Sequence, residues 1–174
     1  MQPNDTGALG LSRRVLYWVR ILNIAYGAGI TLMLVMSLVA PQFLFEALGF
    51  NLPDVWGERS IALRGMMLIG IAGAFIVHWM LTMLMQIVDS VHAGDPFVAE
   101  NGSRIQSIAW LLLIGEILSL IIGALVEFVS TPEQPFDTGW RFTLTPWIAV
   151  LMLFVLARVF DHGARLREDL EGTV

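Results

Sequence analysis

The chain has 174 residues, of which 56% are hydrophobic and only 14% are charged. Soluble domains carry roughly a quarter charged residues, so this composition excludes an ordinary soluble protein and predicts an integral membrane protein. The formal net charge of −5 offers no basic surface for nucleic acid, and we expect no direct nucleic-acid partner. Cysteine is absent, which excludes disulfides and thiolate metal sites.

Four apolar stretches predict membrane-spanning helices at about residues 15–40, 65–88, 105–129 and 145–160. The first three reach the roughly 20 residues that a helix needs to cross a bilayer, and the fourth is shorter. Because each run is continuously apolar, helices are favoured over a β-barrel, whose strands alternate. The first run is too long for a signal peptide, so we expect a retained anchor. The predicted fold is all-α: one domain, residues 1–174, forming a four-transmembrane-helix bundle with a tail at 161–174.

The distribution of arginine predicts the orientation, because lysine is absent. Seven arginines lie on one side of the predicted bundle (Arg13, Arg14, Arg20, Arg104, Arg158, Arg165 and Arg167), and three lie on the other (Arg59, Arg64 and Arg141). Positive residues accumulate on the cytoplasmic side of membrane proteins. We therefore expect both termini in the cytoplasm, as an even number of spans requires.

Small residues on the predicted spans indicate close helix packing. They recur at helical spacing on three spans: Ala25 and Gly29, then Gly70 and Ala74, then Gly115, Ser119 and Gly123. Such faces allow helix backbones to approach one another. We expect them to hold the four helices together, with a homo-oligomer interface as the alternative.

Two ionisable residues, His78 and Glu116, fall inside the predicted spans. Each lies about 15 to 16 Å along its helix from the cytoplasmic end, so the two share a depth. A carboxylate in hydrocarbon is costly unless it is protonated or paired, and an imidazole at its level could pair with it. The alternative is structural: Glu116 would hydrogen-bond Ser119, Trp110 or Asn23 and lock helices together. Spacing alone does not decide whether His78 and Glu116 face each other.

Two segments predicted to be cytoplasmic carry the more specific patterns. VHAGDPFVAENGSRI, residues 91–105, places a Gly-Asp-Pro turn after the second span, with Asn101 or Ser103 as a cap for the third. RVFDHGARLREDLEGTV, residues 158–174, continues the fourth helix and carries apolar residues on one stripe. A turn and a solvated helix end are the plain interpretations. A docking surface for a partner is the other, and its residues would be Phe97, Asn101, Arg104, Phe160, Gly163, Leu166, Leu170 and Val174.

These segments resemble the YoaS-like bacterial membrane proteins, catalogued as domain of unknown function 2975. The resemblance rests on a loop pattern, Gly94, Pro96, Phe97, Asn101 and Arg104, and on a closing pattern, Phe160, Gly163, Leu166, Glu168 or Asp169, Thr173 and Val174. It covers the whole chain in length and in number of spans. Ile105 and Gly172 depart from the leucines usual in the family, and the second departure affects how closely the tail contacts would match.

The resemblance implies a bacterial inner-membrane protein that is often encoded beside a small Cro/C1-type helix-turn-helix regulator. We therefore expect a membrane partner that binds or restrains such a regulator in the cytoplasm. The alternative is a small proton-coupled transporter, or transport subunit, that uses Glu116. An enzyme is not expected, because His78, His92 and His162 show no HExxH or other metal-ligand spacing. Neither a metal nor a cofactor is expected.

Overall fold

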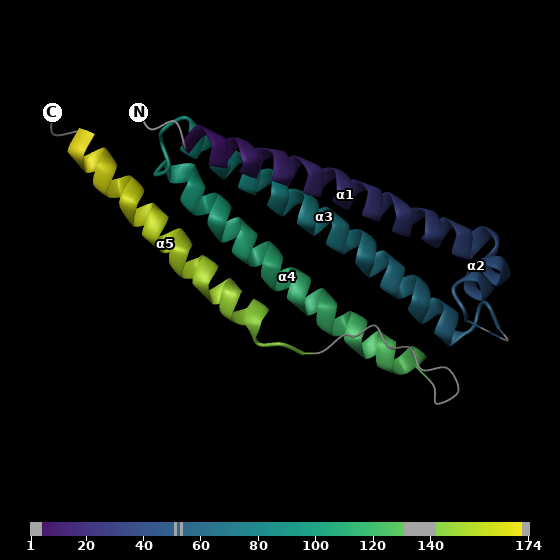
Figure 1. The fold of residues 1–174 in the computed structure, drawn as a ribbon. Coiled ribbons are helices and arrows are strands. Elements are labelled where there is room, and N and C mark those ends of the chain that lie inside the picture. Colours follow the sequence, from purple (N-terminus) through teal and green to yellow (C-terminus); the bar gives the residue numbers. More distant parts are fainter. Residues whose placement is uncertain (1–4, 51, 53, 131–141, 172–174) are drawn as a thin grey trace.

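The computed structural model describes residues 5–50, 52, 54–130 and 142–171, and every regular element within them is a helix. Four helices are long: α1 (Asp5–Val39), α3 (Glu58–His92), α4 (Ala99–Val129) and α5 (Thr145–Glu171) (Figure 1). The fifth, α2 (Pro41–Ala47), is short and follows α1 directly. Ala40 separates the two because a residue before proline is disfavoured in the helical conformation, and its φ is −137°.

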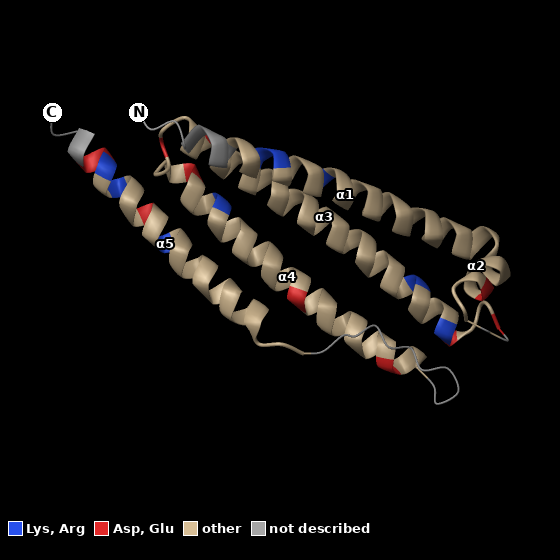
Figure 2. Cartoon of the chain, viewed as in Figure 1, with Lys and Arg blue, Asp and Glu red and all other residues tan. Residues whose placement is uncertain are grey.

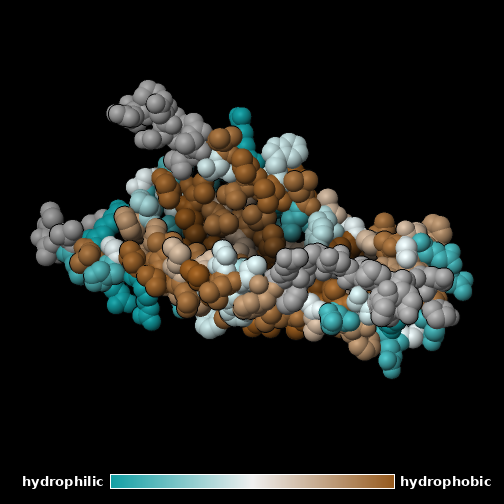
Figure 3. Space-filling model, turned by 60° about the horizontal axis from the view of Figure 1, so that its bottom comes forward, coloured by the Kyte–Doolittle hydropathy of each residue, from teal (hydrophilic) through white to brown (hydrophobic). Residues whose placement is uncertain are grey.

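The four long helices are each long and apolar enough to cross a membrane, which confirms the predicted all-helical membrane architecture. Their apolar side chains are largely exposed, as expected for surfaces that face lipid. Charged residues gather toward the two ends of the helices (Figure 2). Apolar residues cover most of the middle of the face seen in Figure 3. The middle of the helices therefore faces lipid, and the ends of the helices lie in the polar regions on either side of the membrane.

The long helices pack in chain order: α1 against α3, α3 against α4, and α4 against α5. Within the described residues α1 and α5 make no packing contact, so the bundle is open. Both chain termini lie at one end, together with the α3–α4 connection, and α2 lies at the other (Figure 1). We call these the termini end and the α2 end.

Glycine at the α1–α3 interface allows the two helices to approach closely. A Cβ on Gly27 would lie 3.1 Å from the Cβ of Ala74, and Asn23 Nδ2 donates a 2.9 Å hydrogen bond to the Ala74 carbonyl. Gly29, in contrast, has open space around it. Ala25 is exposed as well, so the prediction that this face holds the bundle together is wrong, and the alternative of a homo-oligomer interface stays a prediction. The face that meets α3 contains Asn23 and Gly27, which lie four residues apart and so share one side of the helix.

Buried Arg64 ties α3 to α1 and to the connection after α2. Its Nη2 donates to the carbonyl oxygens of Ser37, at 2.7 Å, and Val55, at 3.1 Å. The guanidinium carbon also lies 4.4 Å from the centroid of the Trp56 ring and 5.6 Å from that of Phe45. The last carbonyls of a helix have no partner within the helix, so Arg64 satisfies one of them at the end of α1.

Arg59 likewise satisfies a free carbonyl group at the end of α4. Its Nε and Nη2 both donate to the Val129 carbonyl, at 3.1 and 2.8 Å, at the last residue of that helix. Val129 packs in a small buried cluster with Phe45, Ala62 and Leu63. Two of the three arginines predicted for the outer side thus serve helix ends. The third, Arg141, lies outside the described residues.

Candidate functional site

The connection between α3 and α4 is a defined turn at the termini end. Gly94 has a φ of 86°, a left-handed conformation that favours glycine. Its N–H donates to the Val91 carbonyl, and the N–H of Asp95 donates to the Ser90 carbonyl, both at 3.1 Å. This pair of bonds is the Schellman arrangement that ends a helix. The predicted Gly-Asp-Pro turn is confirmed, and it directs residues 95–98 toward α5.

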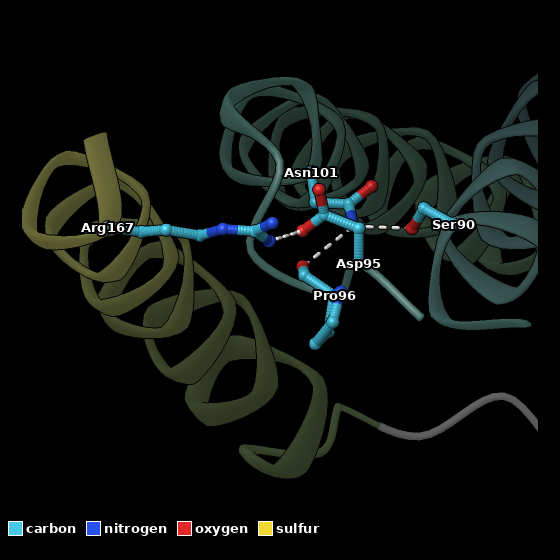
Figure 4. Close-up of polar contacts among 5 residues, drawn as sticks. All are labelled: Ser90, Asp95, Pro96, Asn101 and Arg167. Carbon is cyan, nitrogen blue, oxygen red and sulfur yellow. Dashed lines mark hydrogen bonds and ion pairs between the residues drawn. The ribbon is translucent and has the colours of Figure 1, made fainter. Parts of the chain in front are cut away.

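Asn101 is fully buried and fastens this turn (Figure 4). Its Nδ2 donates to Ser90 Oγ at 2.7 Å and to the Pro96 carbonyl at 2.9 Å. Its Oδ1 accepts a 2.8 Å hydrogen bond from Arg104 Nη1. The prediction that Asn101 or Ser103 caps the helix is wrong, because α4 already begins at Ala99, after Val98 as N-cap. Asn101 instead joins the end of α3, the turn and the start of α4.

The second half of α5 packs onto this turn. The rings of Phe97 and Phe160 have centroids 5.4 Å apart. A Cβ on Gly163 would lie 2.8 Å from Cδ1 of Phe97, so the ring fits only because position 163 has no side chain. One turn further along α5, Arg167 forms an ion pair with Asp95 (Figure 4). We call these five residues, Asp95, Phe97, Phe160, Gly163 and Arg167, the clasp.

A second close approach supports the clasp. The Asp161 carboxylate occupies the space that a side chain at position 102 would need, and Gly102 is buried. Ala164, one turn further along α5, is also buried. Glycine and alanine thus let α4 and α5 approach each other at the termini end.

The structure brings together most of the residues predicted for a docking surface, but some of them are buried and do not reach the molecular surface. Phe97, Phe160 and Gly163 meet in the clasp, and Leu166 is 52% exposed beside it. Asn101 has no exposed surface, so any contribution it makes to docking is one of positioning. Arg104 is half-buried and bonds Asn101. The side chain of Leu170 and all of Val174 lie outside what the structure describes.

Sequence reasoning missed five members of this site: Ser90, Asp95, Gly102, Asp161 and Arg167. Asp95 lies in a turn, and several arginines lie far away in the sequence. The sequence does not indicate which of them pairs with Asp95. Gly102 directly follows a buried asparagine, and a glycine near the start of a helix is a weak sign of close packing. Only the approach of α5 shows what these residues contact.

The two ionisable residues of the spans do not pair. Arg20 Nη2 lies 3.3 Å from His78 Nε2, and because a guanidinium can only donate, the ring nitrogen is the acceptor. Glu116 is half-buried and lines two grooves, one across α1, α3 and α4 and one of about 180 Å³ at the start of α5. Its side chain has no hydrogen bond or ion pair within the described residues.

Two of the three predicted structural partners of Glu116, Asn23 and Trp110, make contacts with other residues. Asn23 donates to the Ala74 carbonyl, and Trp110 packs edge-to-face on Phe154 with centroids 5.2 Å apart. In the part of the chain that the structure describes, no three His, Asp or Glu side chains gather as a metal-ligand set.

Four helices able to span a membrane, with both termini at one end, define a multi-pass membrane protein. The chain belongs to the family described as protein of unknown function DUF2975, whose family model matches residues 14–174. No curated protein and no solved structure matches it. The family pattern found in the sequence thus has a structural basis: Phe97, Phe160 and Gly163, separated by up to 66 positions in the chain, form one contact.

Proposed function

We propose that this protein lies in the bacterial inner membrane with both termini in the cytoplasm. There it binds a small helix-turn-helix transcription regulator and restrains it at the membrane. The clasp and the exposed face of α5 beside it form the docking surface. A regulator held in this way has less access to DNA than a free one, so the membrane protein acts on transcription without touching nucleic acid.

The observation that carries the proposal is the contact of Phe97 with Phe160 and Gly163. It joins the two family-pattern segments into one surface and holds the second half of α5 in place. On that surface Leu166 is 52% exposed and Phe97 is 43% exposed. A pre-positioned surface costs less ordering entropy on binding than a loose tail, and a few apolar anchors carry most of the energy of a small interface.

The charges on the exposed face fit a soluble polar partner. On the last turns of α5, Arg165 and Asp169 flank Leu166 on one side and Arg167 flanks it on the other, and all three are exposed. An apolar anchor within a rim of both charge signs is the usual anatomy of a non-obligate protein interface. The neighbouring lipid-facing part of α5 carries no such rim, because residues 145–157 include no charged side chain.

Co-expression with a small Cro/C1-type helix-turn-helix protein, the kind of partner that the family resemblance implies, tests the proposal. We expect the regulator to sediment with membranes that contain the wild-type protein. Leu166→Ala should release it, because truncating an apolar anchor costs roughly 1 to 2 kcal/mol of binding. Leu151→Ala is the matched control, since Leu151 is 65% exposed on the same helix but within the span. Sedimentation that is equal for both variants, at equal membrane-protein level, would contradict the proposal.

A second candidate is a small proton-coupled transporter or transport subunit, favoured by the half-buried Glu116 beside two grooves, which has no partner among the described residues. Such a carboxylate could bind and release a proton at mid-depth. Glu116→Gln would then abolish transport while the folded protein remains abundant in the membrane. If Gln is tolerated in every assay, Glu116 serves only packing, because the amide retains hydrogen-bonding capacity.

A further inference from the structure

A groove with basic and aromatic lining lies between the start of α1 and the last turns of α3. It has a volume of about 430 Å³. Its lining comes from α1 (Gly10, Arg13, Arg14, Tyr17 and Trp18) and from Met85 of α3. It lies at the termini end, at the edge of the bundle formed by α1, whereas α5 of the clasp forms the other edge, because the long helices pack in chain order. We call it the α1 groove.

The polar end of the α1 groove carries surplus positive charge. Arg13 Nε lies 3.5 Å from Asp89 Oδ1, so one of the two guanidinium charges is offset by a carboxylate. Arg14 is exposed, and among the residues that the structure describes it has no carboxylate partner. Among the side chains that the structure describes, two guanidinium groups with one acidic neighbour therefore leave an excess of one positive charge at the mouth of the groove. Guanidinium groups bind phosphate through charge-assisted, often bidentate hydrogen bonds.

The other end of the α1 groove is apolar and aromatic. Trp18 is 62% exposed, and its ring packs edge-to-face with that of Tyr17, with centroids 6.2 Å apart. Tryptophan and tyrosine gather at the headgroup level of bilayers, where one side of the ring is wet and the other contacts acyl chains. Met85 adds a flexible apolar wall from α3. A basic end and an apolar end within one groove match an amphipathic anion.

We propose that the α1 groove binds the phosphate headgroup of an anionic phospholipid, with the acyl chains along Trp18 and Met85. The surplus charge favours an anionic lipid over a zwitterionic one, because basic pockets between membrane helices attract anionic headgroups. The apolar wall favours a lipid over a free phosphate. This inference is independent of the proposed docking of a regulator, since the groove lies on the opposite edge of the bundle.

The experiment measures thermal unfolding of the purified protein in detergent, titrated with phosphatidylglycerol or with phosphatidylcholine. A ligand that binds only the folded protein raises the unfolding temperature in proportion to its affinity. We expect phosphatidylglycerol to stabilise the wild type more than phosphatidylcholine does. Arg14→Gln should weaken the apparent affinity for phosphatidylglycerol about tenfold, the size of one lost charge-assisted hydrogen bond. Arg14→Lys should retain most of it, because the charge remains.

Arg158→Gln is the matched control, with the same loss of charge at an exposed position on α5, and it should bind phosphatidylglycerol as the wild type does. A second titration uses glycerophosphoglycerol, the water-soluble headgroup of phosphatidylglycerol without its acyl chains. Equal stabilisation by this headgroup alone would show a phosphate site without lipid recognition and would overturn the proposal. Equal effects of the two lipids, or an Arg14→Gln variant that behaves like Arg158→Gln, would also overturn it.

Discussion

The Phe97 ring occupies the space beside Gly163, with its Cδ1 2.8 Å from the point where a Cβ would stand. Gly163→Ala should therefore push the ring away from Phe160 and weaken the clasp by roughly 1 to 3 kcal/mol, as overpacking does. The chain contains no cysteine, so a single cysteine at buried Ala164 reports the change through its alkylation rate. We expect faster labelling in the variant. Gly29→Ala is the control, because open space surrounds Gly29. Equal labelling in both would contradict the contact.

Asn101 should be the most sensitive polar position at the termini end. Asn101→Ala removes the donor to Ser90 and Pro96 and the acceptor of Arg104. Buried partners left without hydrogen bonds cost roughly 1 to 3 kcal/mol each. We expect a lower unfolding temperature in detergent and faster proteolysis between α3 and α4. The exposed Ser103, whose Oγ donates only to the Glu100 carbonyl in its own helix, is the control. If Ser103→Ala lowered the unfolding temperature as much as Asn101→Ala, the special role of Asn101 would be contradicted.

Arg64 should be needed for stability at the α2 end. Arg64→Leu leaves the Ser37 carbonyl without its donor and removes the contact with Trp56, at an expected cost of roughly 1 to 3 kcal/mol. Arg64→Lys should recover only part of this, because an ammonium lacks the planar fork that both donates and stacks. Thermal unfolding of the two variants measures the difference. Exposed Glu58→Ala should unfold like the wild type. Full recovery by lysine would mean that only the charge matters at this position.

The orientation in the membrane can be tested with reporters. A reporter fused after Val174 should be cytoplasmic, and one inserted near Asp54, at the α2 end, should be periplasmic. The physical reason is the excess of arginine at the termini end. Arg59 and Arg64, on the other side, are held by carbonyl oxygens at the ends of α4 and α1. A periplasmic signal from the fusion after Val174 would reverse the orientation.

The four spans could be predicted because a span is a local property. A continuous apolar run of sufficient length becomes a helix wherever water is absent, since only internal hydrogen bonds can then satisfy the backbone. The turn at Gly94 is also local, because the left-handed conformation favours glycine. The sequence likewise predicted that residues 91–105 and 158–174 lie on the same side, and the structure places the described part of both at the termini end.

Contacts between helices depended on the tertiary structure, because sequence spacing defines the depth of a residue along a helix but not which neighbour it faces. His78 and Glu116 have similar depths, yet His78 meets Arg20 of α1 and Glu116 faces the grooves beside α4. Gly27 contacts Ala74 whereas Gly29 faces open space, because two residues correspond to a rotation of roughly 200° about the helix axis.

The amino-acid sequence by itself thus determined a helical membrane protein with four spans and its family. The tertiary structure decided that Asp95 pairs with Arg167, that Phe97 fills the space beside Gly163, and that Asn101 is buried. The physical reason is that apolar length and turn chemistry act within one segment, whereas these contacts form only when α3, α4 and α5 meet.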